Sequence, residues 1–173
     1  MRPLTTSDLE RAVTSCKQSN VQHCFLGVFP ANDAPIGQMG AGELLIVNCC
    51  RADKPGRHWL AVYCVRQRRE FEFFDSTGRQ PQLYSPELKL PRKTIWTYGA
   101  ERLQPLGSHT CGYFCLYFLL CKANSALQAR KFHQILQHLT HQSPRQSNRQ
   151  VVQAVHNHFP TTPKYRQGSK GPA

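Results

Sequence analysis

Cys111 lies between a turn-rich loop and a long apolar run, a position at which a cysteine can act as a nucleophile. The loop carries Pro105, Gly107 and Ser108, and residues 113–120 are apolar almost without a break. A helix made of that run is apolar on every side and must be buried all round. Cys111 would then occupy its first turn, where unpaired N–H groups and the helix dipole favour a thiolate.

A base for this thiol is predicted from two strand-like segments, residues 58–65 and 70–75, joined by a basic tip. They predict an antiparallel hairpin. If the hairpin is centred at residues 67 and 68, His58 pairs with Thr77 and lies diagonal to Asp75. A slip of two residues places His58 and Asp75 directly opposite each other, and either register keeps both side chains on one face. Only an odd slip or a bulge would separate them. We expect His58 to be the base and Asp75 to fix its tautomer.

A tetrahedral intermediate also needs hydrogen-bond donors aimed at its oxyanion. The backbone N–H of Cys111 is one candidate, and the side-chain amide of Gln104, seven residues earlier, is another. His109 is a rival base, but a loop position so close to Cys111 requires an awkward turn, so His58 is preferred. Cys115 lies one helical turn beyond Cys111 and should point into the core. Each residue alone has an ordinary structural interpretation, such as packing for the cysteine, and the ordered set favours catalysis.

The elements that position these residues follow from hydrophobic spacing and turn signals. A capping box of Ser7 and Glu10 predicts a first helix that runs to about Lys17. Residues 143–147 should interrupt helical spacing. We expect one domain over residues 1–160 and a flexible tail over 161–173. The remaining predictions are strands over 24–29, 43–50 and 94–98, a loop over 76–93, and helices over 126–138 and 149–158.

The composition fits a globular protein of one domain, with 173 residues and 40% hydrophobic content. No apolar run is long enough to cross a membrane, and the N-terminus lacks the apolar stretch of a signal peptide. We therefore expect a reducing compartment, no membrane contact, and most of the eight cysteines acting as packing residues. No C-x-x-C pair occurs, and no cysteine or carboxylate near His133, His138 and His141 completes a zinc site. The sequence predicts no metal or organic cofactor.

The charge of the chain is strongly positive, with 22 Lys and Arg against 10 Asp and Glu. The last acid is Glu101, and residues 122–173 carry eight Lys and Arg with no acid. This asymmetry indicates an anionic partner, of which nucleic acid is the commonest. A basic face kept for solubility is the alternative. The candidate nucleic-acid contacts are Arg66, Arg68, Arg69, Arg130, Lys131, Arg145 and Arg149.

Several segments, taken in order, resemble the adenovirus-type maturation endopeptidases (adenain), which share a clan with the Ulp/SUMO-specific cysteine proteases. The resemblance covers roughly residues 20–122 and is carried by 25–27, 46–48, His58-Trp59, the run Phe73-Phe74-Asp75-Ser76-Thr77-Gly78, Gln104, and residues 110–115. It implies an α+β, papain-like fold in which a small mixed sheet packs on a central buried helix, with further helices C-terminal. It also implies catalytic roles for His58, Asp75, Gln104 and Cys111, with Trp59 and Gly112 shaping the site.

The resemblance further implies a cysteine endopeptidase that cleaves viral or virus-like precursor proteins after small residues such as Gly, stimulated by DNA. We expect a monomer in the virion and host nucleus. Lys93 stands where the adenovirus enzymes carry a cysteine that bonds an activating peptide, so a disulfide-tethered activating peptide is not expected. A noncovalent activating peptide is compatible with the sequence. Asp75 replaces their Glu and matches the SUMO-protease branch. The alternatives are a deconjugating isopeptidase for SUMO or ubiquitin-like proteins, and a basic nucleic-acid-binding virion protein with a dormant protease fold.

Overall fold

A five-stranded mixed sheet and the helix α3 form the centre of the fold in a computed structural model, which describes residues 2–67, 69–124, 139 and 143–163. The strands lie in chain order, with outer pairs parallel and inner pairs antiparallel. This arrangement confirms a mixed sheet in an α+β protein. The strands are β1 Phe25–Pro30, β2 Leu44–Asn48, β3 Trp59–Arg66, β4 Glu70–Phe74 and β5 Ile95–Tyr98. The helices are α1 Thr6–Thr14, α2 Ser19–Cys24, α3 Cys111–Ala123 and α7 Pro144–His158, with short 3-10 turns at Ala31–Asp33, Ile36–Gln38 and Pro81–Tyr84.

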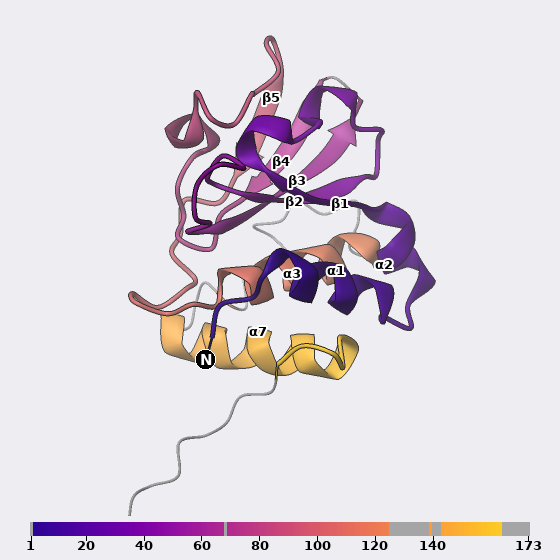
Figure 1. Cartoon of the computed structure of the whole chain (residues 1–173), viewed down its shortest axis with the longest axis vertical. Coiled ribbons are helices and arrows are strands. Elements are labelled where there is room, and N and C mark those ends of the chain that lie inside the picture. Colours follow the sequence, from indigo (N-terminus) through magenta and orange to yellow (C-terminus); the bar gives the residue numbers. More distant parts are fainter. Residues whose placement is uncertain (1, 68, 125–138, 140–142, 164–173) are drawn as a thin grey trace, which may run out of the picture.

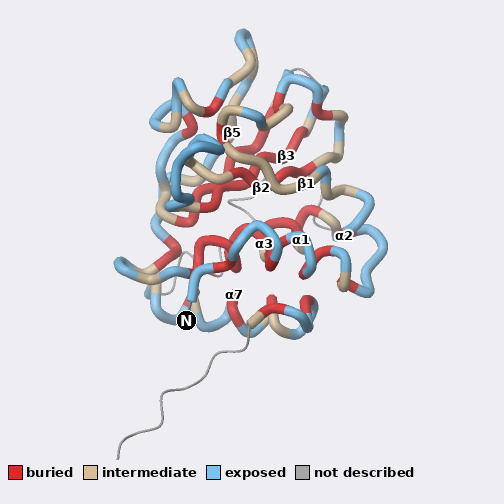
Figure 2. The backbone as a smooth tube through the Cα atoms, in the orientation of Figure 1, coloured by how far each residue is buried: buried red, intermediate tan, exposed pale blue. Residues whose placement is uncertain are grey.

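Helix α3 lies between the sheet and α7 (Figure 1). Its apolar side chains point in every direction, and Tyr113, Phe114 and Phe118 are all buried in the core against β3 and α7. Figure 2 shows α3 as buried along most of its length. The predicted central buried helix is therefore confirmed. The helix predicted over residues 126–138 lies outside the described residues, and none of the described helices has the length and apolar character needed to cross a bilayer.

The β3–β4 hairpin has the first of the two predicted registers. Ala61 pairs with Phe74 and Val62 with Phe73, so the same register extended to His58 places Thr77 opposite it. One irregularity occurs between Cys64 and Arg66, at the tip and far from His58. It therefore does not disturb the faces near the site, and the two faces of β3 pack into two separate apolar clusters.

Helix α1 begins earlier than predicted. Its N-cap is Thr5, and the capping box joins Thr5 to Asp8 rather than Ser7 to Glu10. The Asp8 carboxylate accepts from the backbone N–H of Thr5 at 2.9 Å and also pairs with Arg2 at 2.7 Å. Because this carboxylate is held from two sides, the earlier start is the more stable one. The short helix α2 was not predicted.

Helix α7 also begins earlier than predicted, since residues 144–147, which were predicted to interrupt helical spacing, form its first turn. Ser143 is the N-cap, and its side chain and that of Gln146 form a capping box. Pro144 occupies the first helical position, where a missing N–H costs nothing. Packing continues past residue 160, because Thr162 is buried and the Tyr113 hydroxyl donates to the Pro163 carbonyl at 3.0 Å. Residues 164–173 of the predicted tail lie outside the described residues.

Candidate active site

Cys111 is the first residue of α3, as the sequence predicts. It is buried, with 6% of its surface exposed, and it lines a cleft. The preceding residue, Thr110, donates through its hydroxyl to the side chain of Asn148 on α7 at 2.5 Å. The start of α3 is thus held by the next layer of the fold. The first N–H groups of a helix have no partner within it, so the Cys111 N–H is suited to an anion beside its own sulfur.

His58 and Asp75 meet as predicted, with 2.7 Å between Nε2 and Oδ1. Since Asp75 occupies Nε2, Nδ1 is the ring nitrogen left for Cys111. Burial by itself would lower the pKa of His58, but hydrogen bonding and charge interactions with Asp75 and Cys111 outweigh burial and raise that pKa to about 9. The ring is therefore protonated at neutral pH and can stabilise a neighbouring thiolate.

The Asp75 carboxylate is buried and fully engaged. Besides His58, its Oδ1 accepts from the backbone N–H of Thr77 at 2.7 Å and from the Thr77 hydroxyl at 2.8 Å, while Oδ2 accepts from the Tyr84 hydroxyl. Burial would raise the pKa of Asp75, but these bonds, led by that to His58, lower it. Asp75 therefore remains ionised and fixes the orientation of the imidazole ring.

One turn after β4 holds both Asp75 and the loop that carries Gln104. The Gly78 N–H donates to the Asp75 carbonyl at 2.9 Å, and Gly78 has a φ of +76°. A Cβ atom at Gly78 would come within 2.6 Å of the Ala100 carbonyl oxygen, so the turn requires glycine. The Ser76 carbonyl in turn accepts from the backbone N–H of Gln104 at 3.0 Å.

The side chain of Gln104 is oriented by two serines. The Ser76 hydroxyl donates to Oε1 at 2.6 Å, and Nε2 donates to the Ser108 carbonyl at 2.7 Å. Because a carbonyl can only accept, the amide nitrogen must lie on the Ser108 side. The second N–H of that nitrogen is left for another acceptor. Gln104 is thus a donor of fixed direction on the loop that leads to Cys111.

Trp59 and Gly112 border the site and share a neighbour, the segment before α1. The Trp59 indole donates to the Leu4 carbonyl at 2.8 Å. A Cβ atom on Gly112 would lie 3.1 Å from Leu4 Cβ and 3.3 Å from Trp59 Cδ1. Glycine therefore lets residues 3–6 pass over the start of α3, where they line the cleft. Nothing in the sequence indicated this wall.

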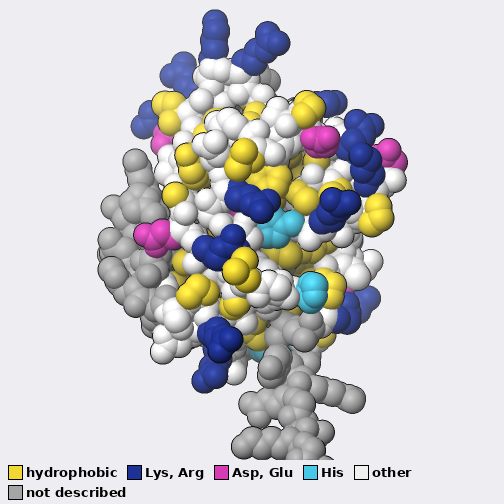
Figure 3. All heavy atoms as spheres, turned by 90° about the vertical axis from the view of Figure 1, so that its left-hand side faces the viewer, with side chains coloured by type: hydrophobic (Ala, Val, Ile, Leu, Met, Phe, Trp, Pro, Cys, Tyr) yellow, Lys and Arg dark blue, Asp and Glu magenta, His cyan; other side chains and the backbone are white. Residues whose placement is uncertain are grey.

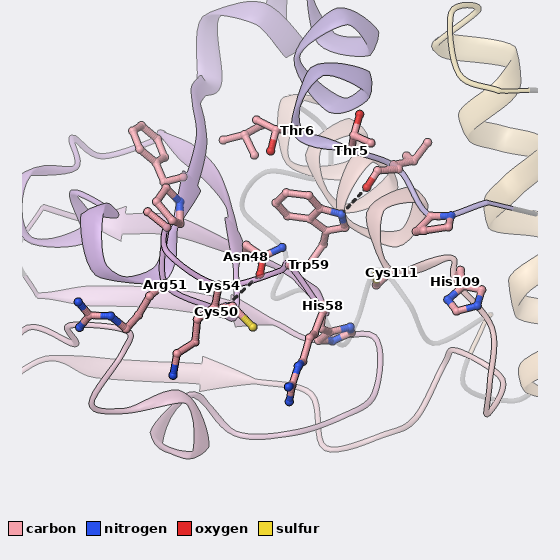
Figure 4. Close-up of a pocket in the computed structure, with 18 of the residues that line it drawn as sticks. Thr5, Thr6, Asn48, Cys50, Arg51, Lys54, His58, Trp59, His109 and Cys111 are labelled. Carbon is pink, nitrogen blue, oxygen red and sulfur yellow. Dashed lines mark hydrogen bonds between the residues drawn. The ribbon is translucent and has the colours of Figure 1, made fainter.

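The cleft has a volume of about 530 Å³ and is lined by His58, Trp59, Gln104 and Cys111 together with residues 3–6, 28–30, 48, 50–52, 54, 56 and 57. Figure 4 shows Cys111 and His58 beside each other at this cleft. The structure therefore brings together all four residues predicted for catalysis. His109 also lines the cleft but is exposed, and among the described residues it has no carboxylate holding its ring.

The two other cysteines of α3, Cys115 and Cys121, differ from Cys111. All eight are free, and Cys115 is fully buried, which raises the pKa of its thiol well above the ordinary value. Burial likewise raises the pKa of Cys121 to about 12. These thiols belong to the packing of α3, as predicted. The described residues contain no cluster of three or more potential metal ligands, and His133, His138 and His141 lie outside them.

The predicted nucleic-acid contacts do not form one patch within the described part of the chain. Arg66 and Arg69 lie at the β3–β4 hairpin, whereas Arg145 and Arg149 lie on α7, on the other side of α3 (Figure 1). Arg68, Arg130 and Lys131 are outside the described residues. One charge in the basic C-terminal third is also neutralised internally, because Lys122 pairs with Glu72.

Sequence reasoning missed the residues that hold the predicted ones: Ser76, Thr77, Tyr84 and Asn148. The Asp-Ser-Thr run carried a signal for Thr77, since aspartate often accepts from the backbone N–H two residues on. Tyr84 and Asn148 reach the site from distant parts of the sequence and left no local signal. These supporting bonds turn a set of candidate residues into a fixed constellation.

No protein-family model matches the chain. A protein named "Protease" from Porcine adenovirus A serotype 3 is 34% identical over 110 residues, which cover 55% of this chain and 54% of that protein. The chain thus spans about half the length of the curated relative that it matches. Together with the His58, Asp75 and Cys111 geometry, this similarity confirms the resemblance drawn from the motifs: the chain is related to an adenovirus protease.

Proposed function

We propose that this protein is a cysteine endopeptidase of papain-like fold. The observation that carries the proposal is His58, held at 2.7 Å by a buried, ionised Asp75 while it interacts with Cys111 at the cleft. A histidine between a carboxylate and a thiol at a helix start is the arrangement that thiol proteases need. The similarity to an adenovirus protease supports the same function.

In the proposed mechanism, the Cys111 thiolate attacks the scissile carbonyl carbon. The developing oxyanion accepts from the Cys111 backbone N–H and the free N–H of Gln104. The His58 imidazolium then gives its proton to the leaving amine, which leaves an acyl-enzyme. Neutral His58 next takes a proton from water, and the hydroxide displaces Cys111 and releases the acid.

For substrates, we propose viral or virus-like precursor proteins cleaved after small residues such as Gly. We also propose DNA as an activator, supported by the net charge of +12, and action in the virion and host nucleus. An activating peptide would bind without a disulfide, since Lys93 occupies the position of the tethering cysteine and is exposed.

The test is cleavage of a Gly-containing peptide series by the wild type and by Cys111→Ala, with and without DNA, at two salt concentrations. Cys111→Ala should lower kcat by about 10⁴-fold or more. Cys115→Ala is the matched control, because that thiol lies one turn further along the same helix, and it should keep most activity. Full turnover by the Cys111 variant would overturn the assignment.

A deconjugating isopeptidase is the second candidate, favoured by Asp75 in place of Glu. A covalent ubiquitin-like probe distinguishes the two functions. Efficient labelling of Cys111 by this probe, with no effect of DNA on peptide cleavage, would favour deconjugation over precursor processing.

A further inference from the structure

Two hollows adjoin His58, and both are basic. The first is the cleft of about 530 Å³, and the second has a volume of about 490 Å³. Both are lined by His58, Gln104 and Ser108, so two of the candidate catalytic residues lie where the hollows meet, and Cys111 lines the first hollow beside them. Figure 3 shows a face on which Lys and Arg side chains lie on either side of a histidine. Peptide hydrolysis itself does not require cations on both sides.

Five cations line these hollows. Arg51 and Lys54 belong to the first, Arg57 to both, and Arg79 and Arg102 to the second. All five are exposed at the surface. In Figure 4, Lys54 and Arg51 follow His58 along the cleft, progressively further from Cys111. A chain that passes His58 from one hollow into the other would therefore meet positive charge in both.

Few carboxylates offset these charges among the described residues. None lines the first hollow, and Glu87 is the only one that lines the second. Arg51 pairs with the exposed Asp53, at 3.3 Å between Nε and Oδ1. The other four cations form no ion pair with a described carboxylate. A cleft lined by uncompensated charge of one sign concentrates ligands of the opposite sign.

The loop between β2 and β3, which carries Arg51, Lys54 and Arg57, is anchored at several points. The Ala52 N–H donates to Asn32 Oδ1, and the Cys49 N–H donates to the His58 carbonyl, each at 2.9 Å. Gly56 lies so close to Asn48 that a Cβ would come within 2.4 Å of its Nδ2 atom. Because the backbone is fixed, the charges are displayed at set positions, which favours recognition of a particular ligand position.

We propose that the two hollows recognise acidic side chains of the substrate on opposite sides of the scissile bond. Arg51 and Lys54 select on one side, and Arg79 and Arg102 select on the other. This inference rests on the proposed peptidase function and defines its substrate class. An extended acidic peptide fits better than nucleic acid, because a polyanion lying in both hollows would cover Cys111 and block turnover.

The test uses one neutral peptide that the wild type cleaves, with Asp or Asn placed at each position in turn. One position on each side of the scissile bond should show a kcat/KM about tenfold higher for Asp than for Asn. The gain should come from a lower KM and should shrink at 0.5 M salt. Arg51→Gln with Lys54→Gln should remove the gain on one side only. Arg79→Gln with Arg102→Gln should remove it on the other. Lys54→Glu should reduce the preference for Asp on that side further than Lys54→Gln does, since it adds a negative charge beside Arg51 and Arg57.

Arg145→Gln is the matched control, since this exposed arginine at the start of α7 lines neither hollow. Equal rates on Asp and Asn peptides at every position would overturn the inference while leaving the peptidase assignment intact. The inference would also be overturned if Arg145→Gln lost the preference for Asp as fully as the variants in the hollows do. The preference would then come from the net charge of the protein rather than from the hollows.

Binding provides a readout that does not depend on turnover. Fluorescence anisotropy of labelled Asp and Asn peptides with Cys111→Ala should show tighter binding of the Asp peptide. Tighter binding of the Asp peptide without any cleavage by the wild type would overturn the peptidase assignment and the placement about a scissile bond, while the preference of the hollows for acidic peptides would stand. If a single-stranded DNA displaced the Asp peptide and bound more tightly than that peptide, the inference would be overturned in favour of nucleic acid as the ligand of the hollows.

Discussion

Two ion pairs of the same length lie near opposite ends of α3. His58 and Asp75 are 2.7 Å apart beside its first residue, and Lys122 and Glu72 are 2.7 Å apart near its last turn. The Lys122 side chain is fully buried and its Nζ atom lies 4.8 Å from the centre of the Tyr63 ring. The His58 side chain is 17% exposed and lines the cleft.

The comparison shows that a short buried ion pair does not by itself indicate a reactive site. Lys122 and Glu72 join α3 to β4 and line neither of the two hollows beside His58. His58 has an opening and a thiol beside it, and both are needed for chemistry. We call Lys122 and Glu72 the closed pair and His58 and Asp75 the open pair. Desolvation makes the closed pair costly to break, whereas the cleft beside the open pair lets a substrate reach it.

The largest expected effect is on the open pair. Asp75→Asn should lower kcat/KM by about 10²- to 10⁴-fold, because an amide does not hold the charged ring as a carboxylate does. Steady-state kinetics on the Gly-containing peptide checks this. Glu72→Gln, the same change in the closed pair, should leave the kcat of the folded enzyme unchanged. A comparable loss of kcat in both variants would abolish the distinction.

Lys122→Ala should mainly lower stability, by about 3–5 kcal/mol in the free energy of unfolding, because Glu72 is left buried and unpaired. Urea denaturation measures the change. The double variant Lys122→Met with Glu72→Leu should regain most of it, since it leaves no unpaired charge. If Lys122→Ala retained wild-type stability, the pair would not be structural.

The open pair should also make stability depend on pH. The pKa of His58 is raised from its ordinary 6.5 to about 9 by Asp75 and Cys111 against the effect of burial. Its contribution is therefore fully present below pH 6.5 and is lost as the pH rises through about 9. Tm should fall between pH 7 and 10, and His58→Gln should show a shallower fall. An identical pH dependence in the variant would contradict the raised pKa.

The smallest expected effect is at Gly112. The Cβ of Gly112→Ala would lie 3.1 Å from Leu4 Cβ, so residues 3–6 must move by a few tenths of an ångström. We expect a loss of about 1 kcal/mol in the free energy of unfolding, typical of mild overpacking, and a rise in KM. Thermal denaturation and peptide kinetics check both. Gly99→Ala is the matched control, because a Cβ atom there would meet nothing within 4 Å.

The sequence was most informative where a pattern was local and repetitive. Alternation along β3 and β4 predicted the faces that unite His58 with Asp75, and the apolar run predicted α3 from its first residue. The capping box of α1 was misassigned and the start of α7 was placed too late, because several Ser, Thr, Asp and Gln residues compete for each helix start. The sequence places Lys122 in the acid-free basic segment, and only the tertiary fold brings it against Glu72.

The contact between Trp59 and Leu4 has a spectroscopic consequence. The chain has two tryptophans, and Trp96 stacks on Phe71 at 4.9 Å between ring centroids, in the cluster on the other face of the sheet. Trp59 alone of the two lines the cleft. In a Trp96→Phe protein, indole fluorescence would come from Trp59 alone. A ligand that entered the cleft or displaced residues 3–6 would therefore change this emission and could be followed without a label.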